Sequence, residues 1–233
     1  MTDSQASARF YALIPCAGSG SRAQAPGATL AKQYQSVAGQ PMVMHTLAAF
    51  AAVHTIRDVL VVVAPGDDFF ERHSAPCVVR DCGGPSRARS VRNGLHDLFE
   101  QGARGDDWVL VHDAARCLVT PAQIEALIAA CRDDSVGGLL AHRLPDTLKQ
   151  EDGSGRVAAT LPRADKWLAQ TPQMFRAGAL RDALTAAAVN GVAVTDEASA
   201  IEAAGYAPLL VPGAMRNFKV TWPDDFELME KWL

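Results

Sequence analysis

The chain reads Leu13-Ile14-Pro15-Cys16-Ala17-Gly18-Ser19-Gly20-Ser21-Arg22 where an apolar segment, Phe10–Ile14, runs into a loop of small residues. Residues without bulky side chains let a backbone approach a ligand closely, and successive backbone N–H groups then form a cradle for an anion. Arg22 closes the loop and Lys32 follows it, which places positive charge where phosphates would gather. The stretch therefore predicts that a nucleoside triphosphate is held at a strand-to-loop turn near the N-terminus.

Two better-known phosphate loops fit the sequence poorly. The G-x-x-x-x-G-K-S/T pattern of a P-loop is missing from the chain. Gly18, Gly20 and Ala23 match the G-x-G-x-x-G/A dinucleotide fingerprint loosely. The next strand-like run, Val59–Val63, however, comes too late to carry the acidic partner that this fingerprint needs about 20 residues on. A dinucleotide-dependent oxidoreductase is therefore disfavoured, and a Gly-rich turn without a ligand stays the plainer alternative.

Bulk properties narrow the class of protein. The chain has 233 residues, of which 48% are hydrophobic and 21% charged, and this suits one globular domain over residues 1–233. A net charge of −4 argues against a general nucleic-acid binder. Five scattered cysteines without a C-x-x-C pair disfavour zinc and favour a reducing compartment. Because the N-terminus lacks an apolar signal core and no long apolar run follows, we expect a cytoplasmic protein without a membrane span.

Short apolar runs alternate with helical patterns along the first part of the chain. The predicted strands and helices are residues 10–14, 59–63, 77–80, 108–111 and 137–141, and residues 41–53, 86–99 and 121–131. This alternation predicts a doubly wound, Rossmann-like α/β domain whose largely parallel sheet is covered by helices on both faces. Further along, we expect helices over residues 177–189, 195–204 and 223–232, and a strand over residues 206–211.

Residues 142–160 interrupt the alternation. The polar run Glu151–Gly155 predicts a turn between two extended arms, Thr147–Gln150 and Arg156–Thr160. A hairpin that stands outside a sheet has unpaired edges, and a second subunit is one way to cover them. We therefore expect a β-hairpin arm over residues 142–160, inserted within the domain and suited to forming a homodimer.

Polar clusters follow the predicted strands, and ligands of open α/β sheets bind beyond the carboxyl ends of strands. Gly84 and Ser90 come after the third strand, and His112 to Arg116 come at the end of the fourth. Asp113 is the best candidate for Mg²⁺, which is often held by one or two carboxylates together with substrate phosphates. A cap or turn role is its alternative. Arg116 suits either a phosphate or Asp113 as its partner, and His112 is expected to be packed and hydrogen-bonded.

A second polar set lies in the C-terminal third of the chain. Its members are Arg163, Thr171, Gln173, Thr195, Asp196, Glu197 and Lys219. Thr195 and the acids that follow it also fit a helix N-terminus, with the threonine as the cap. Lys219 is flanked by apolar residues, so it is either a strand lysine that reaches out to water or the cation of a buried site.

These motifs together resemble the 2-C-methyl-D-erythritol 4-phosphate cytidylyltransferase family of the non-mevalonate isoprenoid pathway. The resemblance runs from about residue 10 to the C-terminus, and its motifs occur in the family's order. They are residues 15–22, 32–34, 83–91, 111–116, 146–149, 171–173, 195–199 and 217–221.

The resemblance implies a reaction and a set of site residues. CTP and 2-C-methyl-D-erythritol 4-phosphate, a small sugar-alcohol phosphate, would give a cytidine diphosphate derivative and pyrophosphate, with Mg²⁺ as cofactor and Asp113 as its ligand. The implied catalytic cations are Arg22, Lys32 and Lys219. The implied CTP-binding residues are Pro15, Cys16, Ala17, Gly18, Ser19, Gly20, Gly84, Ser90, Asp113 and Ala114. The implied acceptor-binding residues are Arg116, Thr147, Arg163, Thr171 and Thr195, of which the arm would carry Thr147 and Arg163 into a partner's site.

Three positions depart from the family pattern. Cys16 stands for a small alanine and makes the loop open to oxidation, Pro85 stands for an acidic residue, and Cys117 stands for a proline. Pro85 offers no backbone donor, which bears on how cytosine is recognised. Two rival functions are kept: a cytidylyltransferase that uses ribitol 5-phosphate, and a CTP-binding regulatory module without turnover.

Overall fold

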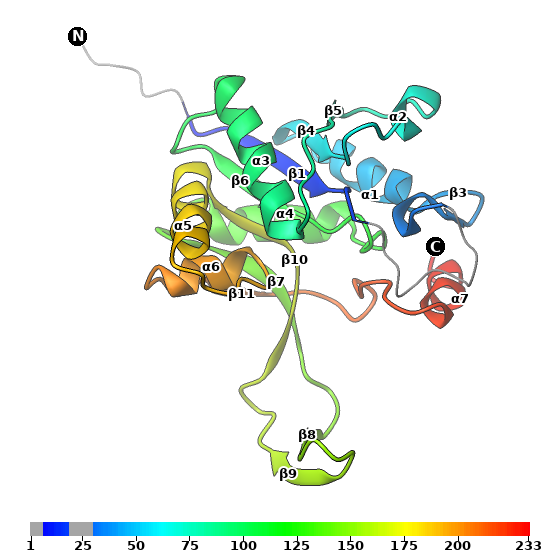
Figure 1. The fold of residues 1–233 in the computed structure, drawn as a ribbon, viewed down its shortest axis with the longest axis vertical. Coiled ribbons are helices and arrows are strands. Elements are labelled where there is room, and N and C mark those ends of the chain that lie inside the picture. Colours follow the sequence, from blue (N-terminus) through cyan, green and yellow to red (C-terminus); the bar gives the residue numbers. More distant parts are fainter. Residues whose placement is uncertain (1–6, 19–29) are drawn as a thin grey trace.

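The fold is seen in a computed structural model that describes residues 7–18 and 30–233. The described residues form a seven-stranded sheet in the order β11-β7-β10-β6-β1-β4-β5 (Figure 1). Its strands are β1 (Phe10–Pro15), β4 (Ile56–Val62), β5 (Val78–Arg80), β6 (Trp108–Val111), β7 (Gly137–Arg143), β10 (Trp167–Arg176) and β11 (Leu209–Pro212). Neighbouring strands are parallel except at β10, which runs antiparallel to both β6 and β7. The prediction of a largely parallel α/β sheet is confirmed.

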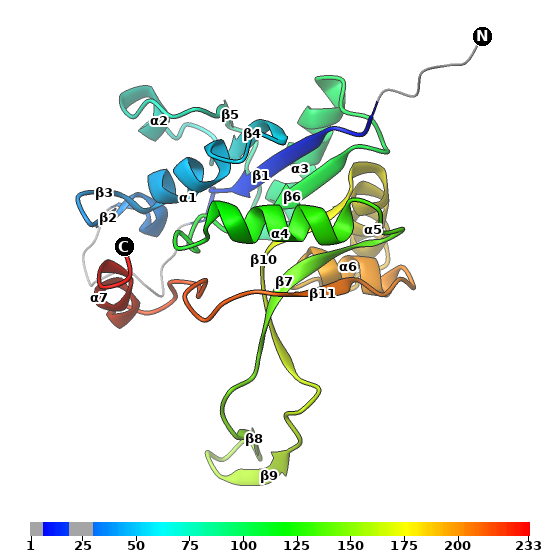
Figure 2. The ribbon, with the colours of Figure 1, turned by 180° about the vertical axis from the view of Figure 1, so that it is seen from behind.

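Helices cover both faces of this sheet, as Figures 1 and 2 show from opposite sides. They are α1 (Met42–Ala51), α2 (Phe69–Arg72), α3 (Arg87–Glu100), α4 (Pro121–Cys131), α5 (Ala177–Val189), α6 (Glu197–Ala203) and α7 (Asp224–Glu230). Successive residues of a strand point to opposite faces. Ala12 and Ile14 of β1 accordingly pack into the cluster that contains α1 and α4, whereas Tyr11 and Leu13 pack against α3, α5 and α6. This explains why β1 is an unbroken apolar run.

The main difference from the sequence prediction is β10, for which no strand was expected. Residues 170–175 of the strand are buried, yet they include the polar run Gln170-Thr171-Pro172-Gln173, which hides the strand from a hydropathy pattern. A smaller difference concerns α6. Its cap is Asp196, which accepts a hydrogen bond from the Ser199 N–H, so the expectation of Thr195 as the cap is wrong.

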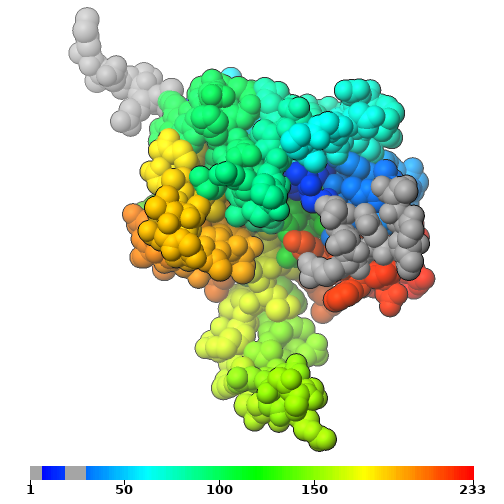
Figure 3. Space-filling view, viewed as in Figure 1, coloured from blue at the N-terminus to red at the C-terminus, as the bar shows by residue number. Residues whose placement is uncertain are grey.

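The predicted hairpin is present. β8 (Leu148–Glu151) and β9 (Val157–Leu161) pair antiparallel in a sheet of their own, which stands away from the body of the molecule (Figures 1 and 3). Another small ribbon, β2 (Ser36–Val37) and β3 (Gln40–Pro41), follows a 3-10 helix at Lys32–Tyr34. No helix in residues 7–18 and 30–233 is long and apolar enough to cross a membrane.

Candidate active site

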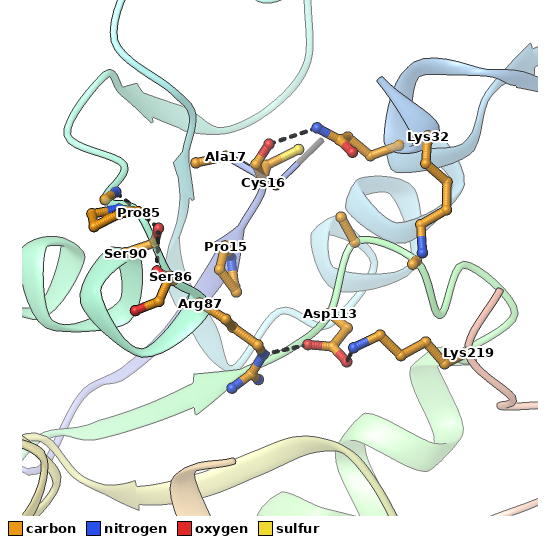
Figure 4. A pocket seen from close by; sticks show the side chains of 15 residues that line it. Pro15, Cys16, Ala17, Lys32, Pro85, Ser86, Arg87, Ser90, Asp113 and Lys219 are labelled. Carbon is orange, nitrogen blue, oxygen red and sulfur yellow. Dashed lines mark hydrogen bonds and ion pairs between the residues drawn. The ribbon is translucent and has the colours of Figure 1, made fainter. Parts of the chain in front are cut away.

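The loops beyond the ends of β1, β5 and β6 enclose a cavity of about 530 Å³, shown in Figure 4. Most of the predicted nucleotide-site residues in the described part of the chain line it. The lining residues are Pro15, Cys16, Ala17, Gly18, Lys32, Gln33, Gly84, Pro85, Ser86, Arg87, Ser90, Asp113, Ala114, Ala115 and Lys219. The expected convergence of these clusters is therefore confirmed, while the expectations for Ser19, Gly20 and Arg22 lie outside the described residues.

Backbone hydrogen bonds hold the loop after β1 against its neighbours. The Cys16 N–H donates to Val62 O at 2.7 Å, and the Gln33 side chain donates to Cys16 O at 2.8 Å. A Cβ at Gly83 would overlap Ala17 Cβ, so only glycine lets the loop after β5 pack this closely against the loop after β1. Gln33 belongs to a motif that the sequence singled out, but its role as an anchor of the loop was not predicted.

The Cys16 thiol faces away from solvent. It is 2% exposed, and its Sγ lies 4.0 Å from the Tyr34 hydroxyl, which itself donates to Asp67. Burial raises the pKa of Cys16 to about 12, so the thiol stays protonated at neutral pH. The expectation that this cysteine leaves the loop open to oxidation is therefore wrong.

Gly84 and Ser90 form one hydrogen-bonded unit at the edge of the cavity. The Gly84 N–H donates to Ser90 Oγ at 3.0 Å, and the Ser90 hydroxyl donates to Ser86 O at 3.1 Å. Ser86 caps α3 by accepting a hydrogen bond from the Arg89 N–H. The Ser90 hydroxyl thus shapes the loop on which Pro85 faces the cavity.

Two lysines approach the cavity from separate parts of the chain. Lys32 Nζ donates to Val220 O at 2.5 Å, and Lys219 Nζ lies 2.8 Å from Asp113 Oδ2. Lys219 lies in an irregular segment after β11, so it is not a strand lysine. Its side chain is 39% exposed, so it is a cation at the open side of the site rather than in a buried one. The two lysines therefore approach the cavity with different contacts, Lys32 on the backbone of Val220 and Lys219 on the carboxylate of Asp113.

A partly buried network of charges fixes that carboxylate. Arg87 Nε donates to Asp113 Oδ1 at 2.7 Å, and the rest of the guanidinium binds Glu197 through two hydrogen bonds of 2.7 and 2.9 Å. Figure 4 shows Arg87 and Lys219 reaching Asp113 from opposite sides. Burial would raise the pKa of Asp113, but the charges of Arg87, Lys219 and Arg116 hold it well below its usual value. Asp113 is therefore ionised throughout the physiological range.

Sequence reasoning missed the link between Arg87 and Glu197. Glu197 is 1% exposed and was interpreted as an acid in the first turn of a helix. The two residues are 110 positions apart, so no local pattern connects them. Glu197 belongs to the second polar set, and Arg87 belongs to the motif at residues 83–91. The sequence carried no other signal for this contact.

A second cavity of about 180 Å³ adjoins the first. Its lining residues are Arg87, Asp113, Arg116, Ala169, Gln170, Thr171, Gln173, Thr195, Asp196 and Lys219. Three of these, Arg87, Asp113 and Lys219, line the first cavity too, so the two spaces meet at the charged network. Three predicted acceptor-site residues, Arg116, Thr171 and Thr195, are brought together here. Thr147 and Arg163 belong to the segments that carry the arm and line neither cavity.

His112 is completely buried behind Asp113, as expected. One ring nitrogen lies 3.0 Å from the Thr171 hydroxyl and the other lies 3.2 Å from Arg116 O. Burial lowers the pKa of His112 to about 3, so the ring is neutral at physiological pH. Thr171 Oγ1 also accepts a hydrogen bond from the Asp113 N–H at 3.0 Å.

A doubly wound sheet with a cavity lined by cations beyond the ends of its strands defines an α/β nucleotide-binding protein. Residues 10–233 match the model of the family described as 2-C-methyl-D-erythritol 4-phosphate cytidylyltransferase. The chain belongs to this family.

Individual relatives agree with that assignment. The chain is 56% identical to a protein of Bordetella pertussis named 2-C-methyl-D-erythritol 4-phosphate cytidylyltransferase, over 96% of this chain and 98% of the relative. It is 64% identical to "Bifunctional enzyme IspD/IspF" of Albidiferax ferrireducens over 95% of this chain, and spans 52% of that longer relative. A crystal structure of a 4-diphosphocytidyl-2C-methyl-D-erythritol synthase superposes with a TM-score of 0.85 at 37% identity, covering 98% of this chain and 99% of that one.

Proposed function

We propose that the protein transfers a cytidylyl group from CTP to 2-C-methyl-D-erythritol 4-phosphate, giving 4-diphosphocytidyl-2-C-methyl-D-erythritol and pyrophosphate, a step of isoprenoid precursor synthesis. Family membership supports this activity. The observation that carries it is the meeting of two cavities, of about 530 and 180 Å³, at one cluster of Arg87, Asp113 and Lys219. A nucleotide in the larger space and an acceptor phosphate in the smaller one would bring their reacting atoms together at this cluster.

The chemistry needs positioning and positive charge more than a base. The nucleophile is an oxygen of the acceptor phosphate, which is already ionised and attacks the α-phosphorus of CTP in line as pyrophosphate leaves. Lys32 and Lys219 would stabilise the negative charge that develops on the transferring group, and Arg22 would join them. For this reaction the cations and the carboxylate that line the cavities suffice, and no nucleophile activated by a base is required.

We propose Mg²⁺ as the divalent cofactor, with Asp113 as its protein ligand. The described residues contain no cluster of three or more His, Cys, Asp or Glu side chains that could hold a metal without further ligands. A single carboxylate fits Mg²⁺ when substrate phosphates supply the remaining oxygens. Arg87 and Lys219 each contact one oxygen of Asp113, and each carboxylate oxygen has a further lone pair that could bind a cation. The ion would neutralise phosphate charge beside the lysines that line the larger cavity.

The remaining site residues are assigned by the cavity they line or, where they line neither cavity or lie outside the described residues, by the family pattern. For CTP we propose Pro15, Cys16, Ala17, Gly18, Ser19, Gly20, Gly84, Ser90, Asp113 and Ala114. For the acceptor we propose Arg116, Thr171 and Thr195, together with Thr147 and Arg163 from the arm of a second subunit. Arg116 Nε is buried with no hydrogen-bond partner among the described residues, which suits a site for an anion.

The arm supports a homodimer as part of this proposal. β8 and β9 pair only with each other among the described residues, and the arm stands away from the body of its own chain. A covering subunit would protect its edges and would bring Thr147 and Arg163 to the neighbouring site. We propose one nucleotidyltransferase domain over residues 1–233 with this arm inserted, working in the cytoplasm.

Pyrophosphate release tests the proposed function. The purified protein is given CTP and Mg²⁺ with either 2-C-methyl-D-erythritol 4-phosphate or ribitol 5-phosphate as the acceptor. Release with the first acceptor alone is expected. Release with ribitol 5-phosphate alone would support cytidylyl transfer but to a different acceptor. CTP binding without pyrophosphate release in the presence of either acceptor would indicate a regulatory module.

A further inference from the structure

The segment that carries Lys219 also holds the other lysine of the larger cavity. Lys32 Nζ donates to Val220 O at 2.5 Å, and the Val220 N–H donates at 2.9 Å to the backbone oxygen of Ala115, a residue that lines this cavity. Lys219 directly precedes Val220, and its Nζ lies 2.8 Å from Asp113 Oδ2. The main chain at residues 219–220 therefore carries one of the two lysines and binds the other.

Helix α7 fixes this main chain through one carboxylate. Asp225 Oδ2 accepts a hydrogen bond from the Thr221 N–H at 2.7 Å and another from the Trp222 N–H at 2.9 Å. Both N–H groups come directly after Val220 in the chain. Hydrogen bonds to a carboxylate are stronger than those between neutral groups. The carboxylate of Asp225 therefore fixes the chain at the point just beyond the lysine.

Apolar packing joins α7 to the segments that follow both lysines. Met229 of α7 is 1% exposed and belongs to a buried cluster that also contains Val220 and Val37 of β2. β2 comes shortly after the 3-10 helix that begins at Lys32. Figures 1 and 2 show α7 beside the ribbon of β2 and β3. One short helix therefore contacts the chain next to each lysine.

We propose that Asp225 is a positioning residue that sets where Lys32 and Lys219 stand in the larger cavity. Asp225 lines neither cavity, and its carboxylate contacts the backbone of residues 221–222. Its effect on the reaction would therefore pass through the lysines. A misplacement of about 1 Å, caused by a substitution away from the reacting atoms, can cost about 100-fold in rate. The kinetic part of this proposal rests on the proposed cytidylyl transfer.

Three variants separate this role from a merely structural one. Asp225→Ala removes the acceptor of both hydrogen bonds, whereas Asp225→Asn keeps one oxygen that can accept them. Asp224→Ala is the matched control, because it makes the same chemical change at the neighbouring, exposed position of α7. If Asp225→Ala does not fold, as judged by circular dichroism, Asp225→Leu takes its place, because leucine has nearly the shape of aspartate without an acceptor.

The first test needs no substrate. Acetic anhydride labels lysine amines, and mass spectrometry measures the labelling rate at each lysine, with Lys149 of the arm as the internal reference. Lys32 and Lys219 should label roughly threefold to tenfold faster in Asp225→Ala than in the unmodified protein. Their rates should be unchanged in Asp225→Asn and in Asp224→Ala. Unchanged labelling of both lysines in Asp225→Ala would overturn the proposal, since Asp225 would then serve α7 alone.

Hydrogen exchange tests the contacts themselves. The amides of Thr221 and Trp222 should exchange about tenfold faster or more in Asp225→Ala, and should recover in Asp225→Asn. Exchange at the same rate in Asp225→Ala and in the unmodified protein would show that the carboxylate does not hold these groups, and would also overturn the proposal.

Kinetics then connect the lysines to the reaction. Asp225→Ala should lower kcat and kcat/KM for CTP by the same factor, about tenfold or more, because the lysines act on charge that develops in the transition state. Asp225→Asn should restore both. Calorimetric titration with CTP should still find the full number of sites in Asp225→Ala, which separates displaced lysines from a smaller folded fraction.

Two kinetic results would overturn the proposal. They are normal turnover in Asp225→Ala and a loss of CTP sites that accounts for the whole fall in kcat. If the unmodified protein had no turnover, the proposed function would fail, while labelling and hydrogen exchange would still decide whether Asp225 positions the two lysines.

Discussion

Replacing Glu197 with glutamine would remove one charge from the network that fixes Asp113. Glu197 is 1% exposed and receives two hydrogen bonds from Arg87, which holds Asp113 with its third. The amide of glutamine presents one acceptor and one donor to a guanidinium that carries only donors. The variant therefore leaves Arg87, which is 26% exposed, with one anionic partner in place of two.

The size of the effect follows from the geometry. Unit charges about 4 Å apart attract by about 4 kcal/mol at an effective dielectric of about 20. Removing one partner of a buried ion pair typically costs about 3–5 kcal/mol, because the other charge stays desolvated. Arg87 keeps Asp113 as a partner, so we expect Glu197→Gln to lose about 3 kcal/mol of unfolding free energy. For a chain of this size that corresponds to a fall in Tm of about 6–12 °C.

Urea unfolding followed by circular dichroism measures this loss, with pyrophosphate release measured alongside. Glu202→Gln is the matched control, because it makes the same chemical change at an exposed position of the same helix, α6. The control should change stability by less than about 0.5 kcal/mol. Equal stability of the two variants would refute the reasoning that the Arg87–Glu197 pair supports the site.

Three further predictions concern the cavity and the core. Lys32→Ala and Lys219→Ala should each lower kcat by roughly 100-fold, and near-normal turnover in both would contradict their assignment as catalytic cations. Gly83→Ala should lose about 1–3 kcal/mol of unfolding free energy and weaken CTP binding in calorimetry, because its Cβ would overlap Ala17; unchanged CTP affinity would count against this close packing. Burial would raise the pKa of Asp107, but hydrogen bonds from two arginines lower this pKa to about 2. The stability that ionised Asp107 adds to the folded protein is therefore complete above about pH 4 and is lost as the pH falls through about 2. Unfolding free energies measured from about pH 5 downward should therefore fall about 2 kcal/mol further in the unmodified protein than in Asp107→Asn, and parallel curves would contradict this.

Local patterns in the sequence were enough to predict most of the sheet. β1 and β4 are short apolar runs bounded by polar loops, so hydropathy alone indicates buried parallel strands. β10 escaped because its buried residues include Gln170 and Thr171, whose polar atoms are satisfied by partners far along the chain. Its burial depends on contacts that exist only after folding.

In the candidate site too, features set by local sequence could be predicted, and features set by contacts between distant segments could not. The cavity could be predicted because its clusters follow strands, and the carboxyl ends of parallel strands lie on one edge of a sheet. Two contacts could not be predicted, because each joins segments that meet only in three dimensions. They are the pairing of Arg87 with Glu197 and the hydrogen bond between His112 and Thr171. Cys16 was misjudged for the same reason: its exposure depends on the packing of Tyr34, which comes from a later segment.

The fate of the α-phosphate of CTP tests the central claim most directly. CTP labelled with radioactive phosphorus at the α position is incubated with the protein, Mg²⁺ and 2-C-methyl-D-erythritol 4-phosphate, and the products are separated. We predict that all transferred label appears in the cytidine diphosphate derivative of the acceptor, with one equivalent of unlabelled pyrophosphate released for each CTP consumed. Label in CDP or CMP without transfer to the acceptor, or bound CTP that is never consumed, would contradict the account.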